Sequence, residues 1–142
     1  MILLNEIQQY FDALIGTDKP VKRVFYFTEE GELQDVDSDI APEEQPFLIV
    51  ITPSVISVGR DLLERNNFLI YLLAKEDKFE KSTFEIQKEL QPIINSLKNK
   101  LIDDSDNCKW ISGLDAESFH IDPERKMFTK YTGWSISFSV TG

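Results

Sequence analysis

Cysteine, histidine and glycine are scarce in this 142-residue sequence, and each shortage excludes a class of site. Cys108 is the only cysteine, so the chain can form neither an internal disulfide nor a metal site built from cysteines. His120 is the only histidine. The six glycines match neither a dinucleotide-binding fingerprint nor a P-loop, and we therefore expect no nucleotide cofactor.

Long hydrophobic runs and leader features are also missing. The longest continuous apolar segment, Phe68–Ala74, is far shorter than the ~20 residues that cross a bilayer. The first residues, Met-Ile-Leu-Leu-Asn-Glu, lack the basic start and the long apolar core of a signal peptide. We therefore expect a protein that is soluble and intracellular where it is made, with no membrane partner.

Positive charge is in short supply: 15 lysines and arginines face 25 aspartates and glutamates, for a net charge of −10. Nucleic-acid binding needs clustered basic residues that neutralise phosphates, and here the basic residues are scattered. We therefore expect no sequence-specific nucleic-acid binding. An acidic surface suits a basic partner, or a wall along which DNA passes without sticking.

What the sequence does contain is a clear alternation of large apolar and small polar residues from Gly133 to Val140. Side chains of a strand point alternately to its two faces, so this spacing predicts a strand with one apolar face and one serine face. Ser135, Ser137 and Ser139 form the small face. The apolar face consists of Trp134, Ile136, Phe138 and Val140.

The best helix signal lies in the second half of the chain. Ser82 and Glu85 match a capping box, in which each side chain satisfies a free backbone donor of the other residue. Pro92 lies inside this helix, and we expect a kink there and not a break. The apolar stripe that follows the capping box consists of Ile86, Leu90, Ile93, Leu97 and Leu101.

Apolar spacing and turn residues predict the remaining elements. Pro53 cannot donate to a sheet ladder, so we expect a bulge or an edge at this position. We expect helices over 2–15 and 82–101, strands over 21–28, 33–36, 47–51, 54–58, 68–74, 109–113, 117–121 and 133–140, a surface loop over 35–45, a polar link over 59–66, and turns at 29–32, 103–107 and 122–125. Short links between strands favour antiparallel pairing. The prediction is a single α+β domain over residues 1–142, with an antiparallel or mixed sheet and two amphipathic helices packed on one face.

Few residues suggest catalysis or metal binding. On a strand, His120 would share a face with Ser118 and Asp122, but their spacing does not give a reliable nucleophile–base hydrogen bond, so we expect a surface histidine. Counted from Asp35, Ile40 and Pro46 stand where a calcium loop needs glycine and glutamate, so we expect the acidic runs 35–39 and 103–106 to be solvated loops. We therefore expect no metal site and no enzymatic activity, and we expect Trp110 and Trp134 to be core residues.

The order of the elements resembles the tail terminator, or tail-completion, proteins of long-tailed phages and prophages. The matching parts are the opening helix, the buried strand Phe68–Ala74, the helix Ser82–Leu101 and the strand Gly133–Val140. The acidic proline turn before the last strand is similar as well. This resemblance implies an α+β structural protein of the virion tail, made in the bacterial cytoplasm.

The same resemblance implies a partner. Members of the family form a hexameric ring that ends the tail tube and joins it to the capsid connector, so the implied partners are other copies of this chain and other tail and connector proteins. Acidic residues of the predicted hairpin and loop are then candidates for subunit or partner contacts. They are Glu29, Glu30, Glu32, Asp35, Asp37, Asp39, Glu43 and Glu44. The net charge leaves an alternative open, which is an acidic immunity or inhibitor protein that blocks a basic partner.

Overall fold

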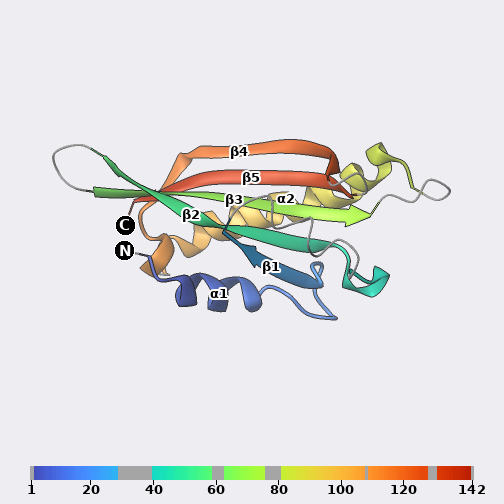
Figure 1. Cartoon of the computed structure of the whole chain (residues 1–142), viewed down its shortest axis with the longest axis horizontal. Helices are drawn as coiled ribbons and strands as arrows, with labels where there is room; N and C mark the ends of the chain where they lie inside the picture. Colours follow the sequence, from blue (N-terminus) through green and yellow to red (C-terminus); the bar gives the residue numbers. More distant parts are fainter. Residues whose placement is uncertain are drawn as a thin grey trace.

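The computed structural model describes residues 2–28, 40–58, 63–75, 81–107, 109–127 and 131–141. Two α-helices and five strands make up the fold, with two short 3-10 helices at the connections (Figure 1). In chain order the elements are α1 (Leu4–Asp12), β1 (Arg23–Phe27), η3 (Pro42–Glu44), β2 (Phe47–Val58), β3 (Leu63–Lys75), α2 (Thr83–Asp104), η4 (Lys109–Ile111), β4 (Leu114–Met127) and β5 (Tyr131–Thr141).

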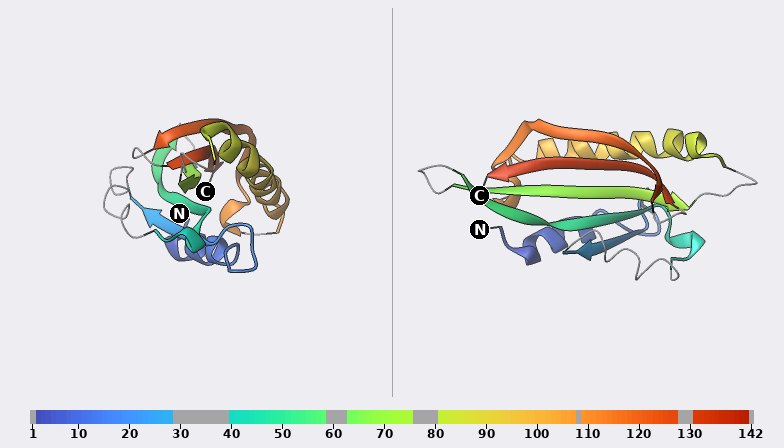
Figure 2. Two further views of the ribbon diagram at one scale, coloured as in Figure 1. Left: turned by 90° about the vertical axis from the view of Figure 1, so that its right-hand side faces the viewer. Right: turned by 45° about the horizontal axis from the view of Figure 1, so that its top comes forward.

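The five strands form one mixed sheet in the order β1-β2-β3-β5-β4. Only the β1–β2 pair is parallel, and the other three pairs are antiparallel. α2 runs along one face of the sheet, and α1 lies near β1 (Figures 1 and 2). Buried residues of both helices belong to one apolar cluster with the same sheet face. The predicted α+β architecture is therefore confirmed, with the sheet in its mixed form.

β5 has the two faces that its alternation predicts. Ile136, Phe138 and Val140 are buried in the cluster beneath the helices, and Trp134 packs against that cluster. The Phe138 ring stacks on Phe68 of β3 at a centroid distance of 5.0 Å. The serines lie on the opposite face. This strand is an interior member of the sheet, so it places apolar side chains along the centre of the core.

α2 begins as predicted, with Ser82 as its N-cap: the Ser82 hydroxyl accepts a hydrogen bond from the Glu85 N–H at 3.3 Å. The helix continues through Pro92 and ends at Asp104, so the predicted turn at 103–107 starts too early. Its buried residues are Ile86, Leu90, Ile94, Leu97 and Leu101. Ile94 thus takes the core position predicted for Ile93, and Ile93 is half-buried beside the core.

α1 is shorter than its apolar spacing predicts. Ile7 and Phe11 are buried, but the helix ends with Ala13 as its C-cap. Gly16 therefore does not follow the helix end directly. Its N–H donates instead to the Val21 carbonyl at 3.2 Å, which closes the turn that leads into β1.

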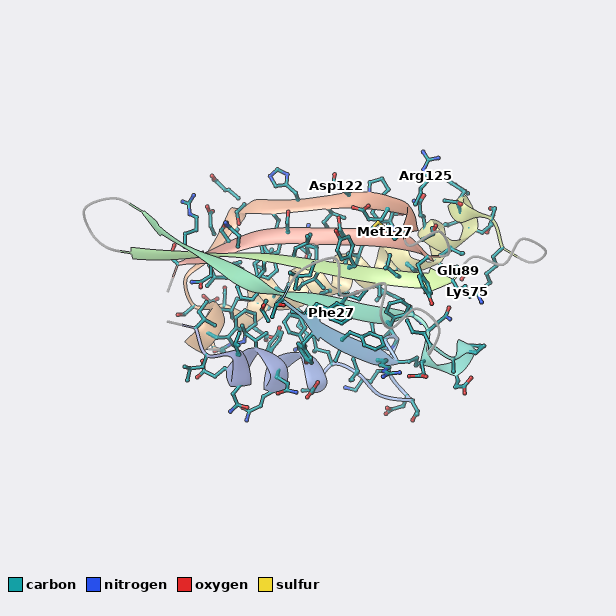
Figure 3. The ribbon with its side chains drawn as sticks, in the orientation of Figure 1. Phe27, Lys75, Glu89, Asp122, Arg125 and Met127 are labelled. Atoms are coloured by element: carbon teal, nitrogen blue, oxygen red, sulfur yellow. The ribbon has the colours of Figure 1, made fainter. Side chains whose placement is uncertain are left out.

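β2 is covered on both sides, as its uniform apolar run predicts. Leu48 and Val50 are buried in the cluster beneath the helices. Phe47 and Ile49 are buried in a second cluster on the opposite face. Met127 and Phe27, from the two outer strands, also belong to this second face (Figure 3). Its buried members are Phe27, Phe47, Ile49, Tyr71, Leu73 and Tyr131.

The β2–β3 hairpin confirms one prediction and corrects another. Between the pairs Ile51–Leu69 and Ser54–Asn67, β2 has one residue more than β3, which is the bulge predicted at Pro53. β3 already begins at Leu63, so the link predicted over 59–66 is wrong in its second half. Asn66 is buried there, and its side chain donates to the Val140 carbonyl at 3.1 Å. A polar residue can occupy this strand because its amide is paired.

Two predictions near β4 are wrong. Residues 109–113 contain a 3-10 helix and no strand: the adjacent Trp110 and Ile111 both belong to the cluster beneath the helices, whereas neighbours on a strand point to opposite faces. The predicted turn at 122–125 lies inside β4, where Pro123 is in register with Trp134. β4 is an outer strand, and an outer strand tolerates proline because only one of its edges must donate to the ladder.

The predicted strand 33–36, the predicted turn 29–32, residues 35–39 of the predicted loop 35–45 and Cys108 lie outside the described residues. Within the described parts, neither α-helix combines the length and the apolar character needed to cross a membrane.

Candidate functional site

Eight acidic residues are predicted to contact a partner, and the described part of the chain includes two of them. Glu43 and Glu44 lie in η3, directly before β2, and the Glu43 side chain is exposed. The other six lie outside the described residues, namely Glu29, Glu30, Glu32, Asp35, Asp37 and Asp39. Their contact role stays a prediction.

Glu44 is engaged in contacts within its own chain. Its carboxylate forms an ion pair with the Arg23 guanidinium at the start of β1 and accepts a hydrogen bond from the Ala41 N–H at 3.2 Å. The Ala41 N–H and then Arg23 hold the pKa of the Glu44 carboxyl below its ordinary value. Glu44 therefore fixes η3 to β1, and Glu43 remains the exposed carboxylate of this pair.

The side chains around His120 do not converge. His120 is exposed on β4, while Ser118 is engaged with backbone: its hydroxyl donates to the Asp115 carbonyl at 2.6 Å and accepts from the Ser139 N–H at 2.8 Å. Asp122 is exposed further along β4 (Figure 3). Among the described residues, no three His, Cys, Asp or Glu side chains gather where they could hold a metal ion.

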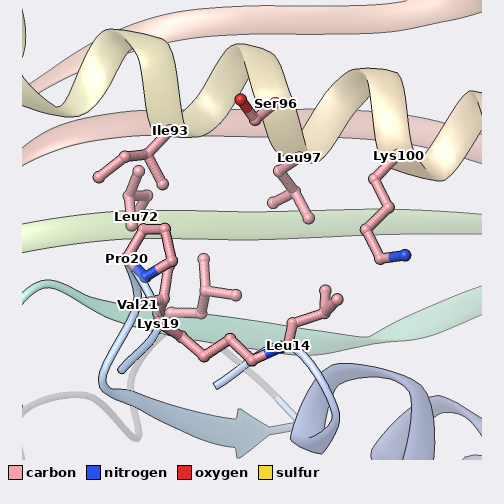
Figure 4. A pocket seen from close by; sticks show the side chains of 10 residues that line it. Leu14, Lys19, Pro20, Val21, Leu72, Ile93, Ser96, Leu97 and Lys100 are labelled. Atoms are coloured by element: carbon pink, nitrogen blue, oxygen red, sulfur yellow. The ribbon is translucent and has the colours of Figure 1, made fainter. Parts of the chain in front are cut away.

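A pocket of about 230 Å³ opens between α2 and the segment that joins α1 to β1 (Figure 4). Its floor is formed by Leu48 and Leu72 of the sheet, and its walls by Val21 on one side and by Ile93 and Leu97 on the other. Almost all of its lining is aliphatic. An apolar recess of this kind binds an apolar group better than a polar substrate.

Two lysines at the rim are the charged groups that line this pocket. Lys19, from the α1–β1 segment, and Lys100, from α2, both place their amines toward the side of Leu14 (Figure 4). The Lys100 amine also lies 3.1 Å from the Asp104 carboxylate. Lys100 is therefore already ion-paired, and Lys19 is the other charged residue that lines the rim.

A network next to this rim ties α1 to α2. The Tyr10 hydroxyl donates to the Asp104 carboxylate at 2.6 Å, and Lys100 lies on the same carboxylate. The Tyr10 hydroxyl and then Lys100 hold the pKa of the Asp104 carboxyl below its ordinary value. Asp104 thus has a structural partner, although the acidic run around it suggests a simple solvated turn.

A second hollow of about 230 Å³ lies at the other end of α2, between η3 and the first turns of the helix. Lys81 and Glu89 line it and form an ion pair of 2.9 Å (Glu89 is labelled in Figure 3). Lys75 at the end of β3 donates its N–H to the Gln45 side chain at 2.8 Å. Because these polar groups are already paired with one another, fewer of them are available to bind a ligand in this hollow.

Three large apolar side chains lie exposed on the described surface. Phe84 in the first turn of α2 is 69% exposed, and Leu3 and Leu4 at the start of α1 are 56% and 59% exposed. Single exposed apolar residues are common, but an exposed phenylalanine on a capped helix is a ready anchor for a partner.

The β2–β3 hairpin extends beyond its neighbours in the sheet. β1 pairs with β2 only as far as Ile51, and β5 reaches β3 only as far as Arg65. The pairs Ser57–Glu64 and Val58–Leu63 therefore lie beyond both neighbours, and among the described strands β2 and β3 pair there with each other alone. Figure 1 shows this projecting part, which we call the arm, at the end of the molecule where both chain termini lie.

Sequence reasoning did not find the pocket, the arm or the Tyr10–Asp104 contact. The exposed apolar residue at the start of α2 carried a weak signal, because Phe84 falls outside the helix's apolar stripe. No model of a known protein family matches this chain, and a search among curated proteins returns no match.

Proposed function

We propose that this protein is a non-catalytic structural subunit of a phage or prophage tail, which assembles with copies of itself into a ring at the end of the tail tube. The ring would join the tube to the capsid connector. The resemblance in element order suggests this role, and it rests on four matching segments.

The arm is the observation that carries the proposal. Strand edges without a partner offer free N–H and C=O groups, and proteins normally pair or protect them. Beyond Ile51 the outer edge of β2 is uncovered by any described strand, so it can accept a strand from a neighbouring subunit. Self-pairing through such an edge builds assemblies from identical chains.

Charge supports the same role. A ring around DNA needs a wall that does not bind phosphates, and a subunit with a net charge of −10 repels DNA. The second candidate, an acidic inhibitor of a basic partner, draws on the same charge. It predicts a monomer whose binding weakens steeply with salt.

The test is the solution mass by light scattering over a wide concentration range, with negative-stain images of any large species. The proposal expects a species near six subunits of 16.4 kDa, which is about 98 kDa. A monomer at every concentration would overturn the ring. Salt-sensitive capture of a basic protein by that monomer would then favour the inhibitor.

An arm-shortened variant makes the test specific. Replacing residues 57–64 with Asn-Gly joins Ile56 to Arg65, which are paired across the hairpin, through a two-residue turn. The sheet contacts of β1 and β5 are preserved, so this variant should fold with unchanged circular dichroism. The variant keeps residues 52–56 of the β2 edge, so the proposal expects weakened association, and a normal ring from this variant would contradict the role of the arm.

A further inference from the structure

We propose that Pro123 blocks strand pairing at the outer edge of β4, and that without this proline a second copy of the chain would pair there. The inference goes beyond the proposed function, because it concerns β4 and not the arm, and it holds whether or not the chain forms a ring. β4 is the last strand of the sheet, and no other described strand pairs with its outer edge.

Only the middle of this edge is regular enough to receive another strand. The β4–β5 register shifts between Asp115 and His120, and it shifts again between Glu124 and Met127. Between the two shifts, the five pairs from His120–Ser137 to Glu124–Gly133 follow one another without a break. Irregular segments bend a strand and interrupt its row of backbone groups, so an added strand can stay in register only along residues 120–124.

The Pro123 nitrogen faces outward in this regular stretch. In an antiparallel ladder, the N–H groups of successive residues point alternately to the two edges of a strand. Proline has no N–H to donate, yet the pairing with β5 continues in register on both sides of Pro123, so its nitrogen lies on the outer edge. The N–H groups of His120, Asp122 and Glu124 therefore point toward β5. Ile121 is the one residue of the stretch whose N–H points outward.

The proline thus removes one of the two outward donors of the stretch and places an exposed ring at that position. Natural sheets protect their outer edges with proline and with charged side chains. Asp122 supplies such a charge, since its side chain is exposed. When two copies pair with Ile121 opposite position 123, their Asp122 side chains lie directly opposite each other, where like charges repel. The missing donor is the main obstacle, and the charge is the second.

A second copy is the partner that would pair with this edge once the proline is gone. The same edge on two molecules can pair antiparallel about a twofold axis, and each copy then offers the other the N–H groups of Ile121 and of residue 123. Restoring the N–H at position 123 therefore adds two hydrogen bonds to the contact, one from each copy. Because the contact uses the same edge of both copies, it produces a dimer and does not continue further.

The first experiment compares Pro123→Thr with the natural chain and two controls by sedimentation over a series of concentrations. Threonine restores the N–H and suits a strand. Pro92→Ala removes an exposed proline from α2, and Asp122→Thr removes the edge charge and keeps Pro123. We expect Pro123→Thr to add a pairing step that is about tenfold or more tighter than any such step of the natural chain. Both controls should associate like the natural chain.

Amide hydrogen exchange identifies the surface that pairs. In the natural chain, the outward Ile121 amide should exchange rapidly, whereas the Asp122 and Glu124 amides, which face β5, should exchange slowly. In Pro123→Thr at concentrations where it dimerises, exchange of the Ile121 amide should slow by about tenfold or more. A slowly exchanging Ile121 amide in the natural chain would overturn the assignment of this edge without any variant. If Pro123→Thr does not fold, Pro123→Ala supplies the same N–H in its place.

The outcomes separate this inference from the proposed function. Equal association of Pro123→Thr and the natural chain would overturn the role of the proline and would leave the ring untouched. Stronger association with a rapidly exchanging Ile121 amide would mean that another surface pairs, which also overturns the inference. Asp122→Thr that associates as strongly as Pro123→Thr would assign the block to charge and not to the proline. A monomeric natural chain, with a Pro123→Thr dimer that protects Ile121, would overturn the ring and support the block.

Discussion

The Tyr10 hydroxyl donates a 2.6 Å hydrogen bond to the Asp104 carboxylate, and this contact joins α1 to the last turn of α2 across 94 residues of sequence. Both groups are partly buried, and Lys100 holds the same carboxylate from the previous turn. The two helices are thereby fixed to each other beside the apolar pocket.

Replacing Tyr10 with phenylalanine removes this hydrogen bond and preserves the ring packing against Phe11 and Trp110. A bond to a charged acceptor contributes about 1.5–3 kcal/mol, and Lys100 still pairs with the carboxylate, so we expect a loss near the lower limit. Urea unfolding measures this loss as a decrease in the free energy of unfolding. In the Asp104→Ala background, the same substitution should cost much less, and an equal cost would show that the bond is not responsible.

The same contact predicts how stability depends on pH. The pKa of the Asp104 carboxyl is lowered in the folded chain from its ordinary 3.8, chiefly by the Tyr10 hydroxyl. As the pH falls through about 4, the unfolded chain takes up the proton first, so the stabilisation is present above that pH and is lost below it. Tyr10→Phe should therefore flatten the acid limb of the stability curve. Unchanged acid dependence would contradict this.

The two faces of β5 predict opposite responses to charge. Ile136→Asp and Phe138→Asp each place an unpaired carboxylate in the core beneath the helices, and we expect either to unfold the domain. Ser137 is half-buried on the opposite face, so Ser137→Asp should cost little. Circular dichroism and urea unfolding compare the three. Similar tolerance at all three positions would refute the assignment of the faces.

Gly133 allows β3, β5 and α2 to approach closely. A Cβ atom at this position would lie 1.9 Å from the Leu72 carbonyl oxygen and 3.1 Å from a Leu90 methyl group. Gly133→Ala should therefore cost at least about 1–3 kcal/mol. Gly16→Ala is the matched control, because its Cβ would meet only side-chain atoms of the exposed Asp18 and Lys19, at 3.0 and 3.2 Å, and no backbone atom. Equal melting temperatures for the two variants would contradict the packing argument.

Ser118 spans the irregular part of the β4–β5 ladder. Its hydroxyl joins the Asp115 carbonyl to the Ser139 N–H, where the register shifts between Asp115 and His120. Ser118→Ala should leave that N–H without its partner and cost about 1 kcal/mol in urea unfolding. Ser137→Ala, a serine on the neighbouring strand, serves as the control and should change stability less.

Regular alternation was the part of this fold that the sequence predicted best. Ile136 and Phe138 on β5 lie on the face that their spacing indicates, because side-chain period and burial are linked directly in a strand. The uniform apolar run of β2 likewise predicted a strand covered on both sides, and Leu48 and Ile49 are buried on opposite faces. The N-cap at Ser82 was also found, since capping depends on residues close in sequence. Residues close together in the sequence were sufficient to predict these features.

The errors arose where tertiary position changes the meaning of a residue. Pro123 indicates a turn in isolation, but an outer strand accommodates it. Trp110 and Ile111 suggest a strand, yet both side chains face the core from a 3-10 helix. The pocket was not predictable, because its walls come from three segments whose spacing only the assembled sheet defines.

β5 lies between β3 and β4 in the sheet, although it follows both in the chain. Its pairs with β3 run from Lys75–Tyr131 to Arg65–Thr141, so 56 to 76 residues separate the partners. Contacts so distant in sequence form slowly, because a long loop must close before any pairing is gained. During synthesis, the edge of β3 that pairs with β5 stays without its partner until residues 131–141 are made, and β4 has no strand to pair with. A chain that stops before Tyr131 therefore lacks an interior strand of its sheet and exposes an edge of β3 that is prone to aggregation.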